Sequence, residues 1–139
     1  MGLDKAAILI KKASLEFDKI INRELEEYGL THAQYRVMKC LYRRSEQGIR
    51  LVDLENFFSM SHPTAIGILQ NLEKKGLVQY RDNPHHARSR FIEPTEEAFR
   101  LRPALDSVGE RLECELTQNL SEQERLELVR LLRKMMGLD

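Results

Sequence analysis

The segment from Ser61 to Gly76 narrowly limits how this 139-residue chain can fold. Ser61 is a favourable helix N-cap, and Pro63 suits the first turn of a helix, where its missing N–H needs no partner. Gly76, placed after two lysines, is a typical helix stop. Apolar residues recur at helical spacing between these signals, and we expect four of them to be buried: Ala65, Ile68, Leu69 and Leu72.

The opposite face of this predicted helix carries no acidic residue. At 100° per residue it presents Pro63, Gly67, Gln70 and Lys74, with Ile66 and Asn71 at its edges. We expect this face to point to solvent.

A short helix is predicted before this segment and a hairpin after it. Leu51, Leu54, Phe57 and Phe58 stand at helical spacing, whereas Leu77–Tyr80 and Phe91–Ile92 resemble two short strands. The connection from Arg81 to Arg90 contains Asp-Asn-Pro, which is typical of a turn, and it is rich in histidine and arginine. The order predicts a helix-turn-helix followed by a hairpin, or wing, with a basic tip.

The helices before this lobe have clear boundaries. An apolar stripe through Ala6, Ile10, Ala13, Phe17 and Ile20 predicts a first helix that runs to about Tyr28 and ends at Gly29. Thr31 and Gln34 form a capping-box pattern that opens a second helix. We expect the inward positions of that helix to be Ala33, Val37, Cys40 and Leu41.

Two further helices are predicted after the hairpin. Thr95 caps a long helix that we expect to be bent or interrupted near Pro103 and Gly109. Ser121 and Glu124 form a second capping box, which opens a last helix. Its inward apolar positions are Leu128, Leu131, Leu132 and Met135. The first and last helices have no obvious cover within one chain, so their stripes predict a homodimer with an intermolecular helical bundle.

Composition and charge narrow the class of protein. A chain of this length, with 42% hydrophobic and 32% charged residues, is expected to form one soluble domain, without a membrane span, in the cytoplasm. Residues 31–95 carry ten Lys or Arg and six Asp or Glu, a net charge of +4, whereas the flanks carry twelve and sixteen, a net charge of −4. This distribution suits a central lobe that faces a polyanion.

The chain resembles the MarR-type winged helix-turn-helix transcription regulators over nearly its whole length. The resemblance is carried by Gly29-Leu-Thr-His-Ala-Gln-Tyr-Arg-Val37, Ser61-His-Pro-Thr64, Asn71-Leu-Glu-Lys-Lys-Gly-Leu-Val78, and Arg88 with Pro94-Thr95. It implies a mainly α (α+β) fold, a winged helix-turn-helix with N- and C-terminal dimerisation helices. Residues 1–139 would then be a single MarR-like domain, with dimerisation regions at 1–29 and 96–139 and a DNA-binding lobe at 30–95.

The resemblance also implies partners. They are double-stranded DNA with a pseudo-palindromic operator, a second copy of the chain, and a small-molecule or redox signal that releases a repressor. Neither a cofactor nor a metal is expected. The residues expected to contact DNA are Ser61, His62, Pro63, Thr64, Gly67, Gln70, Asn71, Lys74, Arg81, His85, His86, Arg88 and Arg90. Those expected at the dimer interface are Ala6, Ile10, Ala13, Phe17, Leu128, Leu131, Leu132 and Met135.

Three positions depart from the family pattern. Ile66-Gly67 replaces a Ser or Thr followed by Arg, which removes a guanine contact worth roughly 1–3 kcal/mol and leaves Ile66 to contact a thymine methyl. His86-Ala87-Arg88 replaces Asp-x-Arg in the wing, so Arg88 would be held differently. The short helix begins at Arg50 in place of Thr or Ser, a local loss of about 1 kcal/mol.

Simpler interpretations stand beside these. The hairpin can protect a sheet edge, and Arg88 and Arg90 can pair with Glu93 or Asp82. His62, His85 and His86 can be surface groups or a metal or pH sensor, while Cys40 and Cys114 can be ordinary residues or redox switches. Tyr35, Met38, Tyr42 and Phe17 can form packing or an effector pocket.

Two other functions compete with DNA binding. One is a winged-helix module for protein partners, and the other is an enzyme. Against the enzyme, the sequence contains none of HExxH, GxSxG and a phosphate-binding glycine loop.

Overall fold

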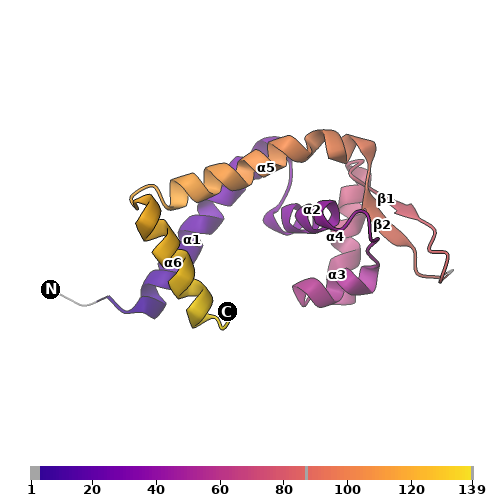
Figure 1. Cartoon of the computed structure of the whole chain (residues 1–139). Helices are drawn as coiled ribbons and strands as arrows, with labels where there is room; N and C mark the ends of the chain where they lie inside the picture. The colour runs from indigo at the N-terminus through magenta and orange to yellow at the C-terminus, as the bar shows by residue number, and fades with distance from the viewer. Residues whose placement is uncertain (1–3, 87, 139) are drawn as a thin grey trace. The chain divides into compact units, whose positions relative to one another are not determined.

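The structure is a computed structural model that describes residues 4–86 and 88–138 of the chain. The described chain is mainly helical with one two-stranded antiparallel sheet (Figure 1), which confirms the predicted fold class. Its elements are α1 (Ala6–Leu25), a 3-10 turn η1 (Glu26–Tyr28), α2 (His32–Arg43), α3 (Leu51–Phe58), α4 (His62–Lys74), β1 (Val78–Arg81), β2 (Phe91–Pro94), α5 (Glu96–Leu116) and α6 (Glu122–Met135).

The chain divides into two compact units. One comprises Leu25–Ser107, and the other combines Met1–Glu24 with Val108–Asp139. Helix α5 contributes to both units, because the boundary falls within it. None of the helices in the described residues combines the length and the apolar character that crossing a membrane requires.

The predicted start of α2 is confirmed in detail. Thr31 Oγ1 accepts a hydrogen bond from the Gln34 N–H, and Gln34 Oε1 accepts one from the Thr31 N–H, both at 3.1 Å. The Gln34 side chain is buried and also accepts from Lys75 Nζ at 3.0 Å, so its oxygen serves two donors. Before this helix, η1 tightens the last turn of α1, and Gly29 follows in the left-handed conformation, at φ 64°.

The predicted inward face of α2 was partly wrong. Val37 and Leu41 are buried, but Ala33 is exposed and Cys40 is only half-buried. The buried face also includes Tyr35, Met38 and Tyr42. The two tyrosines donate hydrogen bonds to main-chain oxygens of α5, from Tyr35 Oη to Leu105 at 3.3 Å and from Tyr42 Oη to Ala98 at 2.5 Å. These bonds satisfy the buried hydroxyl groups and hold the buried face of α2 against α5.

Helices α3 and α4 are joined by the tight turn that a helix-turn-helix requires. Ser59 adopts a left-handed conformation, at φ 49°, after the last residue of α3. Ser61 then caps α4 by accepting a hydrogen bond from the Thr64 N–H at 3.3 Å, as predicted. On the inner side of α4, Ala65, Leu69 and Leu72 are buried and Ile68 is half-buried.

The predicted hairpin is confirmed with a defined register. Val78 pairs with Pro94, Gln79 with Glu93, Tyr80 with Ile92, and Arg81 with Phe91. Ile49 adds a single antiparallel bridge to Ile92, because its carbonyl accepts from the Ile92 N–H at 2.7 Å. Ile49 and Ile92 are both buried, so this bridge attaches the hairpin to the start of α3.

Of the predicted bend or interruption near Pro103 and Gly109, the interruption was wrong. Helix α5 continues from Glu96 to Leu116 through both residues. Thr95 caps it, as predicted, by accepting from the Ala98 N–H at 3.1 Å, while its own hydroxyl donates to the Gly76 carbonyl at 2.6 Å. The exposed Pro103 lacks only one N–H, and the remaining bonds of the helix hold it together.

The second unit exposes much apolar surface. The Ser121 capping box forms as predicted, yet α6 contains no buried residue. Leu128, Leu131, Leu132 and Met135 are 36–56% exposed, and Ala6, Ile10 and Ala13 on α1 are exposed too. The expectation that the α6 stripe points inward is therefore wrong for the single chain. Phe17 on α1 is half-buried.

Candidate nucleic-acid interface

The outer face of α4 is built by the segment that buries its opposite side. Pro63, Gln70 and Lys74 are exposed, and Gly67 lies half-exposed among them. No acidic side chain lies on this arc between Pro63 and Lys74, because Glu73 lies to one side, in a groove described below. The face therefore offers amide and ammonium hydrogen-bond donors without a competing negative charge.

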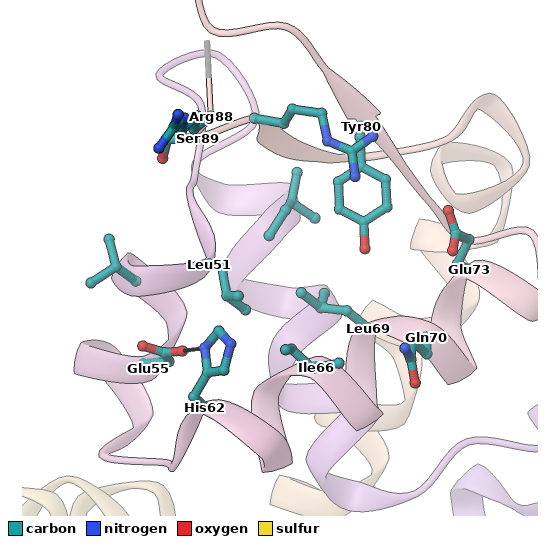
Figure 2. Close-up of a pocket in the computed structure, with 13 residues that line it drawn as sticks. Leu51, Glu55, His62, Ile66, Leu69, Gln70, Glu73, Tyr80, Arg88 and Ser89 are labelled. Carbon is teal, nitrogen blue, oxygen red and sulfur yellow. Dashed lines mark hydrogen bonds and ion pairs between the residues drawn. The ribbon is translucent and has the colours of Figure 1, made fainter. Parts of the chain in front are cut away.

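The N-terminal end of α4 is organised by short polar contacts. Ser61 Oγ donates to Thr64 Oγ1 at 2.9 Å while it caps the helix, so both hydroxyl groups have partners within the chain. His62 Nδ1 lies 2.6 Å from Glu55 Oε1 on α3, an interaction that Figure 2 marks. The Glu55 carboxylate holds the imidazole ring and leaves the His62 Nε2 edge as the group able to bind a partner.

The tip of the hairpin is a polar turn. Asn83 Oδ1 accepts from the His85 N–H at 3.0 Å, and the Asn83 carbonyl accepts from the His86 N–H at 3.1 Å. This geometry confirms the predicted turn at Asp-Asn-Pro. His85 and His86 are exposed, and Ala87 lies outside the described residues.

The three arginines of the hairpin have different surroundings. Arg81 Nε lies 3.0 Å from Glu93 Oε2, and its guanidinium lies 4.8 Å from the Phe91 ring centroid. The Arg90 guanidinium stacks over Tyr80 at 4.3 Å, whereas Arg88 is exposed.

The alternative that Glu93 or Asp82 neutralises Arg88 and Arg90 was wrong as far as the described residues extend. Glu93 pairs with Arg81 instead, and neither Arg88 nor Arg90 has a carboxylate partner there. These two cations remain available for a negatively charged partner.

A groove of about 620 Å³ lies between α3, α4 and the hairpin (Figure 2). It brings together four residues predicted to contact DNA, namely His62, Gln70, Arg88 and Arg90. Pro63, Thr64, Asn71 and Lys74 do not line it. The remaining lining is Leu51, Val52, Glu55, Ile66, Leu69, Glu73, Tyr80, Ser89 and Ile92.

Sequence reasoning missed four polar residues of this groove, one of which is Ser89. Glu55 and Glu73 contribute carboxylates, and Tyr80 contributes the ring on which Arg90 stacks. Burial raises the pKa of the Tyr80 hydroxyl and Glu73 raises it further, against the opposing effect of Arg90, so the phenol stays neutral. The alternation of strand residues could have indicated that Tyr80 and Arg90 lie on one face, but the Glu55–His62 contact crosses two helices and left no sequence signal.

The described residues give no support to a metal site at the histidines or to a reactive thiol at Cys40. Among the described residues, no three His, Cys, Asp or Glu side chains lie close enough to hold a metal ion. Burial raises the pKa of the Cys40 thiol, and this outweighs the opposing influence of Arg44 and Arg43. The thiol is thus held in its less reactive protonated form. Cys114 is exposed on α5.

The aromatic set near α2 belongs to the packed interior. Tyr35, Met38 and Tyr42 are buried, and the two hydroxyl groups bond to the main chain of α5. Burial raises the pKa of Tyr42 to about 12, because ionisation would leave a charge in the core. Met38 and Tyr42 serve packing in the described structure, whereas Tyr35 also lines a second cavity of about 430 Å³ between α2 and α3.

Comparison with known proteins identifies close relatives. A family model described as the MarR family matches residues 28–89. Transcriptional regulator HosA of Escherichia coli O111:H- is 31% identical over 108 residues, which is 78% of this chain and 78% of HosA.

Solved structures with a similar fold match this chain over almost its whole length. The S. aureus MepR–DNA complex has a TM-score of 0.84 at 25% identity and covers 99% of this chain and 100% of that chain. A mutant of E. coli MarR complexed with operator DNA has a TM-score of 0.79 at 28% identity. The match covers 93% of this chain and 91% of that chain.

Proposed function

This chain belongs to the MarR family of transcription regulators, and from that premise we propose that it binds an operator in double-stranded DNA as a homodimer. The observation that carries the proposal is the pairing of an acid-free outer face on α4 with two arginines, Arg88 and Arg90, that have no carboxylate partner in the described residues. Two of the solved structures that it resembles are complexes with DNA, which supports the same partner.

We assign the two contact surfaces different tasks. The outer face of α4 would enter the major groove, where Gln70 and Asn71 can read base edges and Lys74 can neutralise phosphate. Arg88 and Arg90 of the wing would neutralise backbone phosphates or enter the minor groove. Ser61 and Thr64 would act mainly by fixing the start of α4, since their hydroxyl groups bond to each other.

The apolar surface of α1 and α6 supports the homodimer. A helix with no buried residue in the single chain, and with leucines at 36–54% exposure, needs a partner surface to be stable in water. A second copy of the chain supplies a matching surface by symmetry. We propose Ala6, Ile10, Ala13 and Phe17, with Leu128, Leu131, Leu132 and Met135, as part of this interface.

The regulation follows from the family. We propose that the chain is a repressor released by a small-molecule or redox signal, that it acts in the cytoplasm where DNA is accessible, and that it carries no enzymatic activity. The relative HosA is a transcriptional regulator by name, which supports this assignment.

The test is DNA affinity across a salt series. A fragment that spans the chain's own promoter should bind tightly, and log K should fall linearly with log salt concentration. Arg88→Ala should weaken binding and reduce the salt slope by about one. The matched control is Arg100→Ala on α5, which removes one exposed arginine outside the wing and should leave the salt slope nearly unchanged.

Absence of salt-dependent binding would contradict the proposal. It would instead favour the protein-interaction alternative, for which the apolar groove residues Leu51, Ile66 and Leu69 provide a surface. In that case Ile66→Glu should abolish capture of a protein partner.

A further inference from the structure

Gly67 occupies the interior of α4, where nothing in the described fold requires a glycine. Its backbone is outside the left-handed region, and a Cβ placed on it would meet no atom within 4 Å. Glycine is the least favourable residue after proline in a helix interior, because it loses the most backbone entropy on folding. Gly67 therefore weakens α4 without a packing benefit to the chain itself. This points to a role for the glycine in contact with a partner molecule.

The missing side chain leaves open space at this point of the helix surface, here called the hole. Residues three and four positions away are the neighbours of a helical residue, and for Gly67 these are Pro63, Thr64, Gln70 and Asn71. All four are exposed, so they form the rim of the hole without filling it.

The two sides of the rim differ in chemistry. On the N-terminal side lies the apolar ring of Pro63, and the Thr64 hydroxyl is already bonded to Ser61 Oγ at 2.9 Å. On the C-terminal side are the carboxamides of Gln70 and Asn71, for which no side-chain hydrogen bond to a described residue is found. The hole is thus apolar at one edge and lined by free amide groups at the other.

We propose that Gly67 is a specificity-determining residue, whose hole receives the C5-methyl group of a thymine while Gln70 binds the N6 and N7 edge of an adjacent adenine. Thymine is the base that carries a methyl group in the major groove, and a carboxamide pairs bidentately with adenine. A methyl group fits a hole of one missing side chain, and Pro63 gives it an apolar wall. This inference rests on the proposed DNA-binding function and specifies one base step that α4 would read.

The test removes the thymine methyl group and fills the hole at Gly67 in separate steps. A duplex is first selected from a randomised pool by the unmodified chain, and each thymine is then replaced in turn by deoxyuridine, which lacks only the methyl group. At one thymine the replacement should weaken binding by about fourfold, as expected for one buried methyl group. Gly67→Ala should bind the original duplex roughly tenfold more weakly, because its Cβ occupies the hole.

The decisive result is the coupling between the two changes. In Gly67→Ala, deoxyuridine at the sensitive thymine should cause no further loss, whereas a thymine elsewhere keeps whatever effect it has in the unmodified chain. Gly67→Ala should also raise the Tm by a few degrees, which shows that weaker binding is not caused by unfolding. Asn22→Ala on the exposed side of α1 is the matched control, since it improves helix propensity outside α4 and should leave DNA affinity unchanged.

Two outcomes separate this inference from the function on which it rests. If Gly67→Ala binds as tightly as the unmodified chain and responds equally to every deoxyuridine replacement, the hole has no role and the inference is overturned while DNA binding stands. If the unmodified chain shows no salt-dependent binding to any duplex in the pool, the proposed function fails and this inference fails with it.

Discussion

Asp53 illustrates how one residue can replace a cap that the sequence lacks. Arg50 at the start of α3 has no hydroxyl to cap the helix, but Asp53 Oδ2 accepts from the Arg50 N–H at 2.9 Å. The Arg50 guanidinium also reaches the same carboxylate, with Nη2 at 3.1 Å from Oδ1. The expected loss of a cap at Arg50 is thereby at least partly offset.

This arrangement makes the stability of α3 depend on pH. Burial alone would raise the pKa of Asp53, but hydrogen bonds from the Arg50 side chain and backbone bring it below its usual value. A carboxyl whose folded pKa is lowered contributes stability above its unfolded pKa and loses that contribution as the pH falls through the folded value.

Asp53→Ala should therefore lower the free energy of unfolding by about 1 kcal/mol at pH 7, with the difference shrinking below about pH 4. Urea unfolding at a series of pH values measures this. Asp53→Asn keeps an acceptor oxygen but loses the charge. Its free energy of unfolding should therefore lie between those of the unmodified chain and of Asp53→Ala. A constant difference between pH 7 and pH 3 would contradict the assignment.

Gly76 is required by both its backbone and its surroundings. Its φ is +76°, and a Cβ would lie 2.9 Å from Glu97 Oε2. Gly76→Ala should cost about 1–2 kcal/mol of folding stability, from the left-handed backbone together with this close contact.

Two companion variants separate these causes by thermal unfolding. Gly29→Ala has a similar φ of +64° and no atom within 4 Å of its Cβ, so it should report the backbone strain alone. Glu97→Ala in the Gly76→Ala background should recover only the part due to contact. Full recovery would mean that the backbone conformation carries no strain.

At the scale of elements, α5 continues through a proline at which the sequence predicted a bend or an interruption. Pro103 is exposed, and the helix passes through it from Glu96 to Leu116. Tertiary contacts on the opposite side, through the Ala98 and Leu105 carbonyls, explain why the helix persists, since both accept hydrogen bonds from α2.

Pro103→Ala should raise the free energy of unfolding by about 1–3 kcal/mol, because it restores one backbone hydrogen bond and removes a ring that crowds the preceding turn. Chemical denaturation measures this, and Ala104→Gly in the same helix should change stability in the opposite direction. An unchanged or lower stability in Pro103→Ala would show that the helix is adapted to the proline.

At the scale of the whole molecule, self-association is the property that the exposed apolar helices predict. Leu131 is 48% exposed in the single chain and lies within the apolar side of α6. Leu131→Glu should convert a dimer to monomer at micromolar concentration, because burying an unpaired carboxylate at an interface is costly. Sedimentation equilibrium measures the assembly state.

Gln123→Glu provides the charge-matched control, since it adds the same charge at an exposed position near the start of α6. It should leave the assembly state unchanged. A Leu131→Glu protein that still dimerises with the affinity of the unmodified chain would contradict the proposed interface.

The sequence by itself determined the order of the elements, most helix starts and the turn of the hairpin. The caps at Thr31, Ser61, Thr95 and Ser121, and the turn at Asn83, formed as predicted. Each depends on hydrogen bonds between residues at most four apart, so local sequence contains the whole interaction.

Only the tertiary structure decided which side chains meet across elements. The rotation of α2 that buries Tyr35 and exposes Ala33, the contact between His62 and Glu55, and the pairing of Arg81 with Glu93 could not be chosen from sequence. The reason is physical: several polar partners are available for each of these groups, and the packing of helices and the register of the hairpin select one. The same packing left Arg88, Arg90 and the outer face of α4 without acidic partners among the described residues, which is the arrangement on which the proposed function depends.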